Sequence, residues 1–248
     1  MQQTSGFEGG RLTRQEVSDA VSRRGWRFVL GVVRTHVQVR SLAQAAEAAA
    51  CAVAAAGQDA AERLSVDLRA DRVVLTLQTL AEGWITARDV EAADQITAAM
   101  TGLGLATDPD VGGVAPRSVQ VVWIAIDALD IPRIRPFWKA VMGYTDQAGE
   151  SGPDASLADP LGQHPTIWFQ QMDAPRTQRN RIHLDISAPH DEASARIQAA
   201  LAAGGTMLHS ADAPACWVLA DAEGNEACIT TWQGASARTA HAWGVIRP

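Results

Sequence analysis

The stretch VQVVWIAIDALDIPRIRPFWKAVMGY at residues 119–144 carries the clearest structural signal in the chain. It begins with an apolar run, VQVVWIAID, that is typical of a buried strand. Asp130 followed by Pro132 predicts the start of a helix, and Gly143 predicts its end. The stretch therefore predicts a strand that is followed directly by a helix.

The same order of elements recurs farther along the chain. NRIHLDIS at 180–187 predicts a strand, and DEASARIQAALAAGG at 191–205 predicts a helix. Further strands are expected from TIWFQQM at 166–172, ACWVLAD at 215–221 and EACITTW at 226–232. The second half of the chain is thus predicted to contain two similar modules, each with a strand, a helix and further strands.

This half resembles a vicinal oxygen chelate (VOC) domain of the glyoxalase-like branch, over about residues 118–233. The matching motifs are Asp130 through Phe137-Trp138, Arg181-Ile182-His183-Leu184-Asp185, Gly204-Gly205, and Asp221-x-x-Gly224-Asn225-Glu226. The resemblance implies a VOC domain of paired βαβββ modules, whose curved sheet forms a cup for a small-molecule ligand.

Metal enzymes of that superfamily hold a divalent ion in the cup, with a His on the first strand of each module and acids on later strands. Here the first His position is Trp123, the second is His183, the last acidic position is Cys228, and TIWFQQM has no carboxylate. A catalytic ion normally needs three protein ligands. The resemblance therefore implies a metal-independent pocket with no cofactor. The alternative is a divalent ion held by His183, Glu226 and Cys228.

The candidate catalytic residues follow from strand alternation. Asp127 shares a strand face with Trp123, and Asp185 shares a face with His183. If these faces line the cup, His183 is predicted to act as a general base, with Asp185 or Asp127 fixing its tautomer. Cys228 is the candidate nucleophile.

Each of these residues also has a purely structural interpretation. Asp185 can pair with Arg181 at a strand edge, and His183 can be a hydrogen-bonded structural residue. Cys228 can be a small buried hydrophobe, which is the usual state of a free cysteine. The sequence leaves both interpretations open.

The candidate ligand-binding residues are Trp123, Trp168, Glu226 and Trp232. Trp123 stands where the metal enzymes have a ligand, which suggests that a flat apolar surface replaces the ion. Aromatic faces stack planar ligands. The expected ligand is therefore a small organic molecule, with aromatic metabolites as the first candidates.

The first half of the chain predicts a separate domain with the element order αββαββα, which makes the whole protein α+β. Its helix starts are marked by Thr13 with Glu16, by Ser41, and by Thr86 with Asp89. Between the helices, RFVLGVVRTHVQV, LSVDLRA and RVVLTLQTL predict strands because they are β-branched or alternate in polarity.

That order, together with Gly25-Trp26-Arg27, Asp71-Arg72-Val73 and EGWITARDVEAADQI, resembles the pterin-4a-carbinolamine dehydratases over about residues 11–100. The family uses three catalytic His residues. The corresponding positions here fall within Ala60-Ala61-Glu62-Arg63 and at Leu80, and His36 aligns with none of them. The resemblance implies a degenerate scaffold. The alternative is a 4a-hydroxytetrahydrobiopterin dehydratase that uses Glu62 as a lone acid.

The remaining segments predict a flexible N-terminus at 1–10, a linker at 101–117 and a tail at 234–248. The net charge of -7 leaves no basic surface for nucleic acid or an anionic membrane. Neither a signal peptide nor an apolar run of about 18 residues is present, so a cytoplasmic location is expected. Both resemblances allow a homodimer.

Two main functional hypotheses follow. In the first, the protein is a lyase or isomerase that acts on a small organic metabolite without a metal, with His183 as the acid–base group. In the second, the same cup binds a small molecule without turnover, as in resistance proteins. Retained dehydratase activity of the first domain is a third hypothesis.

Overall fold

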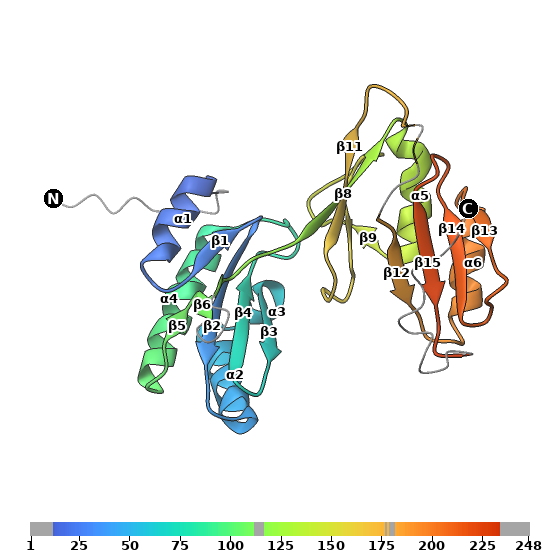
Figure 1. Cartoon of the computed structure of the whole chain (residues 1–248). Coiled ribbons are helices and arrows are strands. Elements are labelled where there is room, and N and C mark those ends of the chain that lie inside the picture. Colours follow the sequence, from blue (N-terminus) through green and yellow to red (C-terminus); the bar gives the residue numbers. More distant parts are fainter. Residues whose placement is uncertain (1–11, 112–116, 177, 179–181, 234–248) are drawn as a thin grey trace. The chain divides into compact units, whose positions relative to one another are not determined.

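The structure is a computed structural model that describes residues 12–111, 117–176, 178 and 182–233 (Figure 1). The chain separates into two compact units, Met1–Val121 and Val122–Pro248. The predicted N-terminus at 1–10 and tail at 234–248 lie outside the described residues, and the domain boundaries drawn from the sequence stay predictions.

Unit 1 has the predicted helix and strand order, with one short helix added before its third strand. Its elements are α1 (Arg14–Ser22), β1 (Arg27–Val29), β2 (Val32–Gln38), α2 (Leu42–Ala56), α3 (Ala60–Arg63), β3 (Leu64–Leu68), β4 (Arg72–Leu77) and α4 (Ala87–Gly102). The strands form an antiparallel sheet in the order β1-β2-β4-β3. Alternate residues of β2 and β4 are buried in one core with α2 and α4.

The predicted helix caps of unit 1 are confirmed. Thr13 and Glu16 form a reciprocal capping box, and so do Thr86 and Asp89. The Ser41 hydroxyl accepts a hydrogen bond from the backbone N–H of Gln44. These bonds satisfy backbone donors that the first turn of a helix leaves without partners.

The segment predicted as a linker, 101–117, contains short strands instead of irregular chain. β5 (Thr107–Asp108) pairs with β2, and β6 (Asp110–Val111) pairs with β7 (Arg117–Ser118). The physical reason is that β1 is short and pairs with only the first three residues of β2. β5 continues the pairing along that edge, at His36 and Val37.

Unit 2 consists of two βαβββ modules. Module 1 contains β8 (Trp123–Ala128), α5 (Ile131–Met142), β9 (Thr145–Asp146), β10 (Leu157–Ala158) and β11 (Thr166–Gln171). Module 2 contains β12 (Leu184–Ser187), α6 (Ala193–Ala202), β13 (Thr206–His209), β14 (Cys216–Ala220) and β15 (Glu226–Thr230). Their sheets have the same order, β8-β11-β10-β9 and β12-β15-β14-β13. In each module the first strand is an edge strand that pairs in parallel with the last.

The two helices of unit 2 pack against each other and share one hydrophobic core with both sheets. Asp130 caps α5, and Gly143 ends it in the left-handed conformation, both as predicted. Gly205 lies so close to Phe137 that a Cβ at this position would stand 2.4 Å from the ring. The glycine therefore allows the close packing of α5 against the start of β13.

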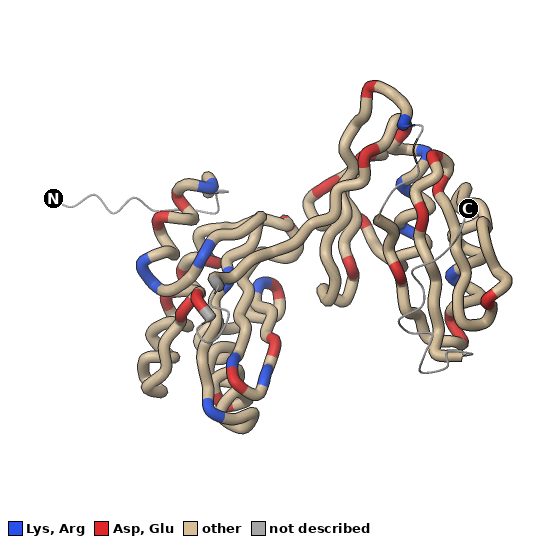
Figure 2. Tube along the Cα trace, in the orientation of Figure 1, with Lys and Arg blue, Asp and Glu red and all other residues tan. Residues whose placement is uncertain are grey.

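Acidic and basic side chains are interspersed along both units, as Figure 2 shows. Among the described residues, no helix is long and apolar enough to cross a membrane.

Candidate functional site

A cavity of about 1140 Å³ lies between the two modules of unit 2. Module 1 lines this inter-module cavity with consecutive β8 residues 124–127, and module 2 lines it with residues 182–184 and 222–226. Because consecutive residues of β8 face the cavity, it lies along the unpaired edge of that strand. The start of β12, which is also an edge strand, forms part of the opposite wall.

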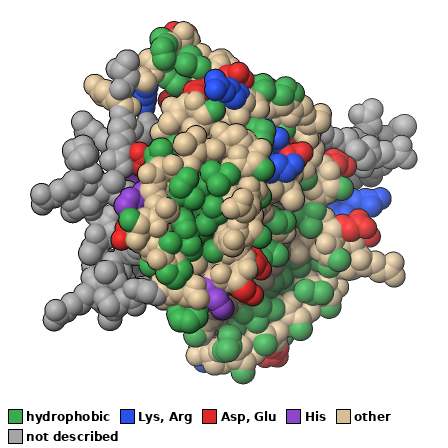
Figure 3. Space-filling view, turned by 90° about the vertical axis from the view of Figure 1, so that its right-hand side faces the viewer, with side chains coloured by type: hydrophobic (Ala, Val, Ile, Leu, Met, Phe, Trp, Pro, Cys, Tyr) green, Lys and Arg blue, Asp and Glu red, His purple; other side chains and the backbone are tan. Residues whose placement is uncertain are grey.

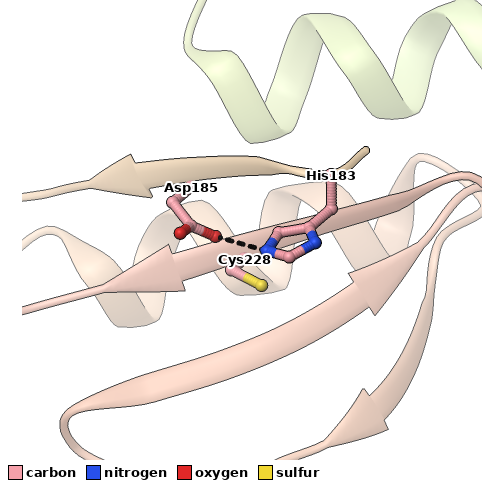
Figure 4. Close-up of side chains that lie close together, drawn as sticks. All are labelled: His183, Asp185 and Cys228. Atoms are coloured by element: carbon pink, nitrogen blue, oxygen red, sulfur yellow. Dashed lines mark ion pairs between the residues drawn. The ribbon is translucent and has the colours of Figure 1, made fainter. Parts of the chain in front are cut away.

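His183, Asp185 and Cys228 come together on one face of the module 2 sheet (Figure 4). The His183 Nε2 atom lies 3.2 Å from Asp185 Oδ1. Asp185 on β12 is the register partner of Cys228 on β15, so their side chains leave the sheet side by side. One potential metal-binding atom from each of the three residues lies within 4.8 Å of the others.

These three side chains differ in their access to solvent. The side chains of His183 and Asp185 are 39% and 52% exposed, whereas Cys228 is only 5% exposed. Leu184 and Ile186, which alternate with them, pack against the core on the other face. The predicted strand alternation is therefore correct for this strand, and the cluster has an exposed His–Asp pair above a buried thiol.

The Cys228 thiol also contacts a second cysteine, Cys216 on β14. Both cysteines are buried in one small cluster with Val218. The neighbouring Cys216 thiol, burial and the Asp185 carboxylate together hold the pKa of Cys228 far above its usual range. A buried thiol that resists ionisation is a poor nucleophile, so this environment disfavours the nucleophilic role considered for Cys228.

The turn after β14 lines the cavity and joins module 2 to module 1 through hydrogen bonds. Asp221 is buried and accepts hydrogen bonds from the backbone N–H groups of Glu223 and Asn225, both at 2.9 Å. Its second oxygen accepts from Trp138 Nε1 at 2.9 Å. The Glu223 carboxylate accepts backbone hydrogen bonds from Leu129 and Asp130 at the start of α5. The Asp221–Asn225 turn is thus hydrogen-bonded to both α5 and the residues just before it.

The structure places the two candidate tautomer-fixing acids differently. Asp185 contacts His183, whereas Asp127 lies 3.8 Å from Arg176 in an exposed ion pair. Asp127, His183 and Glu226 all line the cavity. Arg181, the alternative partner of Asp185, lies outside the described residues.

The predicted aromatic platform is not part of the cavity wall as described. Trp123 and Trp168 share a face of the module 1 sheet, since Trp123 is level with Thr166 and Trp168 with Ala125. Neither residue is among those that line the inter-module cavity. Trp232 is 71% exposed and donates a hydrogen bond to His190 Nδ1 at 3.2 Å.

Figure 3 shows one face of the molecule on which hydrophobic side chains gather in the middle and charged side chains lie mostly toward the margins.

His190 lines a second, smaller groove of about 390 Å³ between α6 and strands β13 and β14. This groove contains His190 but no cysteine or acidic side chain. Chemistry-bearing side chains are therefore concentrated at the inter-module cavity and the adjoining cluster.

Residues 123–230 match the family described as "Glyoxalase-like domain". This part of unit 2 is a glyoxalase-like domain. No curated protein matches the chain.

Several solved structures match part of this chain at low sequence identity. A glyoxalase/bleomycin resistance protein/dioxygenase family enzyme from Burkholderia phytofirmans is 19% identical, covers 44% of this chain and 95% of its own, and gives a TM-score of 0.37. A glyoxalase-related enzyme from Fulvimarina pelagi is 18% identical, covers 46% of this chain and 88% of its own, and gives a TM-score of 0.35. The fosfomycin resistance protein FosX from Mesorhizobium loti is 8% identical, covers 48% of this chain and 95% of its own, and gives a TM-score of 0.38.

Metal binding is common among VOC domains, and the donor set of this glyoxalase-like domain fits a divalent ion. An imidazole nitrogen, a carboxylate oxygen and a sulfur within 4.8 Å of one another meet the requirement for three protein ligands. The alternative ligand set inferred from the sequence contains Glu226. In the structure Asp185 completes the cluster, because the His183 imidazole turns toward it.

Sequence reasoning missed Cys216, Arg176 and Glu223. Cys216 is one of the three free cysteines of the chain. A usable signal was its place in ACWVLAD, where it alternates with Trp217 and so shares a face with Val218. Nothing in the sequence indicated that Glu223 reaches across to the start of α5, because that contact joins residues 93 and 94 positions apart.

Proposed function

We propose that the glyoxalase-like domain binds a small organic molecule in the inter-module cavity and that His183 acts on it as an acid–base group. The observation that carries the proposal is the position of His183, which lines the cavity and also contacts Asp185. A volume of about 1140 Å³ is ample for a small metabolite, and open enough to admit one.

The cavity wall offers both apolar and charged contacts. Ile124, Ile126 and Met172 supply apolar surface, while Arg176 and Asp127 supply charged groups. A ligand with a planar apolar body and one anionic group would match this wall, with Arg176 as its counter-ion. The ligand class is therefore a small organic acid.

His183 has the arrangement that general acid–base catalysis needs. Asp185 accepts a hydrogen bond from one ring nitrogen, Nε2, in the tautomer that protonates this nitrogen. That bond leaves Nδ1 to accept a proton from a ligand in the cavity. A divalent ion held by His183, Asp185 and Cys228 would instead polarise a ligand oxygen if it kept an open coordination position.

Binding is tested with the aromatic anion 8-anilinonaphthalene-1-sulfonate as a fluorescent probe. Ala125 lines the cavity, so Ala125→Trp places a large ring inside it and should weaken saturable binding. Ala199→Trp adds the same bulk on the exposed surface of α6 and should leave binding unchanged. Equal binding by wild type and Ala125→Trp would remove the cavity as the site.

Catalysis is separated from binding by a pair of histidine variants. His209 has the same 39% side-chain exposure as His183 and also contacts an aspartate, Asp212, at 3.0 Å. On any organic acid that the wild type converts, His183→Ala should lose at least about 100-fold in kcat while His209→Ala keeps it. Binding without turnover in the wild type would favour the binding or resistance hypothesis.

For unit 1 we propose a scaffold role in place of dehydratase activity. A buried ion pair between Arg63 and Asp89, at 3.2 Å, occupies the region where the resemblance places catalytic histidines. Asp89 is fully buried and also accepts a hydrogen bond from Thr79. Glu62, the lone candidate acid, is exposed. Detectable dehydration of a pterin carbinolamine that Glu62→Gln abolishes would refute this role.

A further inference from the structure

The groove between α6 and strands β13 and β14, which we call the α6 groove, lies on the far side of the module 2 sheet from His183. Trp217 of β14 lines this groove and packs against the core that α6 shares with the sheet. Its neighbour Val218 leaves the other face of the sheet and packs with Cys228. Because Cys228 shares its face with His183 (Figure 4), the sheet separates the α6 groove from the His183 cluster.

The wall of the α6 groove is apolar, with uncharged polar groups. Leu201, Met207 and Trp217 contribute apolar surface, and Ser194 and Gln198 contribute polar groups. No Asp, Glu, Lys or Arg side chain is among the described residues that line it. Its volume of about 390 Å³ suits a small molecule, since ligand sites measure about 300–1,000 Å³. A wall without charge favours a neutral ligand, because burying an ion without a partner is costly.

Two N–H groups of residues that line the groove have no partner in the part of the chain that the structure describes. One is the indole N–H of Trp217. The other belongs to His190, whose Nδ1 accepts a hydrogen bond from Trp232 Nε1 at 3.2 Å. The neutral His190 ring therefore carries its proton on Nε2, which remains a donor. A ligand with a hydrogen-bond acceptor would match these donors.

Trp232 adds exposed aromatic surface beside the groove. Its side chain is 71% exposed, and its ring lies edge to face with the His190 ring at a centroid distance of 5.3 Å. The next residue along the chain, Gln233, lines the groove. Aromatic faces stack planar ligands, so Trp232 and Trp217 favour an aromatic body over an aliphatic one.

We propose that the α6 groove binds a neutral, planar aromatic molecule that carries a carbonyl oxygen. The ring lies against Trp217 and reaches Trp232, and the carbonyl oxygen accepts the hydrogen bond from His190 Nε2. The organic acid of the proposed function needs a counter-ion, which this groove does not offer. The two sites therefore select different ligands, and the α6 groove does not depend on the inter-module cavity.

The test adds coumarin, a neutral planar molecule with a carbonyl oxygen, to the full-length chain labelled with nitrogen-15. Each of the eight tryptophans gives an indole N–H signal in a proton–nitrogen correlation spectrum, and Trp→Phe variants assign these signals. Coumarin should shift the signals of Trp217 and Trp232 with one common Kd. It should not shift the signal of Trp138, which lines the inter-module cavity.

Two further probes test the chemistry of the ligand. Naphthalene has a similar shape without the carbonyl oxygen, and it should bind about 10-fold more weakly, the effect of one lost hydrogen bond. Coumarin-3-carboxylate should also bind more weakly than coumarin, because no cationic side chain is among the described residues of the groove. Equal affinity for coumarin and naphthalene would contradict the role of the carbonyl oxygen.

Ser194→Phe and Ala195→Phe are a matched pair of variants. Both residues are exposed on α6, but only Ser194 lines the groove. Ser194→Phe places a ring in the groove and should raise the Kd of coumarin by at least about 5-fold, the low end of the effect of overfilling a site. Ala195→Phe should leave the Kd unchanged. If Ser194→Phe fails to fold, the shifts of the wild type with the three probes decide the matter.

Three other results would overturn the proposal. The first is the absence of any shift at Trp217, and the second is a shift at Trp138 in its place. The third is a set of Trp217 and Trp232 signals that move with protein concentration in the absence of coumarin, because a second copy of the chain would then occupy the groove.

Discussion

The hydrogen bond from the indole N–H of Trp138 is predicted to contribute substantially to the unfolding free energy of unit 2, because it joins the two modules. Trp138 is 2% exposed and donates to Asp221 Oδ2 at 2.9 Å, and Asp221 is 3% exposed. In Trp138→Phe the buried carboxylate loses this donor. A hydrogen bond to a charged group is worth about 1.5–3 kcal/mol. The smaller ring leaves a void that adds about 1 kcal/mol, so unit 2 should lose about 2.5–4 kcal/mol of unfolding free energy.

The measurement is native-state hydrogen exchange of the full chain, followed by mass spectrometry of peptides from each unit. Peptides from 122–233 should exchange through a lower-energy opening, while peptides from 12–111 should not change. Trp217→Phe is the control. It removes the same indole from module 2, and its nitrogen has no hydrogen-bond partner among the described residues. If both variants lose the same free energy, the Trp138–Asp221 bond is not a significant link.

Three further predictions concern single sites. Tyr144 is the only tyrosine, and burial together with the nearby Asp159 raises its pKa to about 12. The stability that its neutral form contributes is present below pH 10 and is lost as the pH rises through about 12. An absorbance titration should therefore show the tyrosinate forming near pH 12. Gly205→Ala places a Cβ 2.4 Å from the Phe137 ring and should lower the free energy of unfolding, measured with denaturant, by about 1–3 kcal/mol. Gly102→Ala is the control, because a Cβ at Gly102 meets no atom within 4 Å, and it should leave that free energy unchanged. Asp89→Ala removes the buried partner of Arg63, leaves only the half-exposed Asp59 at 3.4 Å as its counter-charge, and should cost about 3–5 kcal/mol. Asp67→Ala, which breaks the exposed pair with Arg69, should cost at most about 1 kcal/mol.

Much of the secondary structure could be predicted because its signals are local. The caps at Thr13, Ser41, Thr86 and Asp130 each depend on residues within one helical turn, and all are present. The short strands β9, β10 and β13 were not predicted individually. β9 and β10 each have two residues, which is too short for a period-two pattern to show.

The residues of the candidate site could be predicted from the sequence only where the alternation and register of the strands determine which side chains are neighbours. His183, Asp185 and Cys228 were singled out from strand alternation and motif position, and the structure brings them within 4.8 Å. The tryptophans show the limit of that approach. Alternation correctly places Trp123 and Trp168 on a common face, but whether that face lines a cavity depends on how two sheets pack, which no local pattern encodes.

The parallel pairing of β12 with β15 also determines when the cluster can appear during folding. The strands are joined through α6, β13 and β14, so Asp185 and Cys228 are neighbours in space but 43 positions apart in sequence. Pairings at such separation form slowly, because a long loop must close before its contacts are made. A chain still emerging from the ribosome therefore has no such cluster until the last strand of module 2 is available, and its thiols meet imidazole and carboxylate only in the finished sheet.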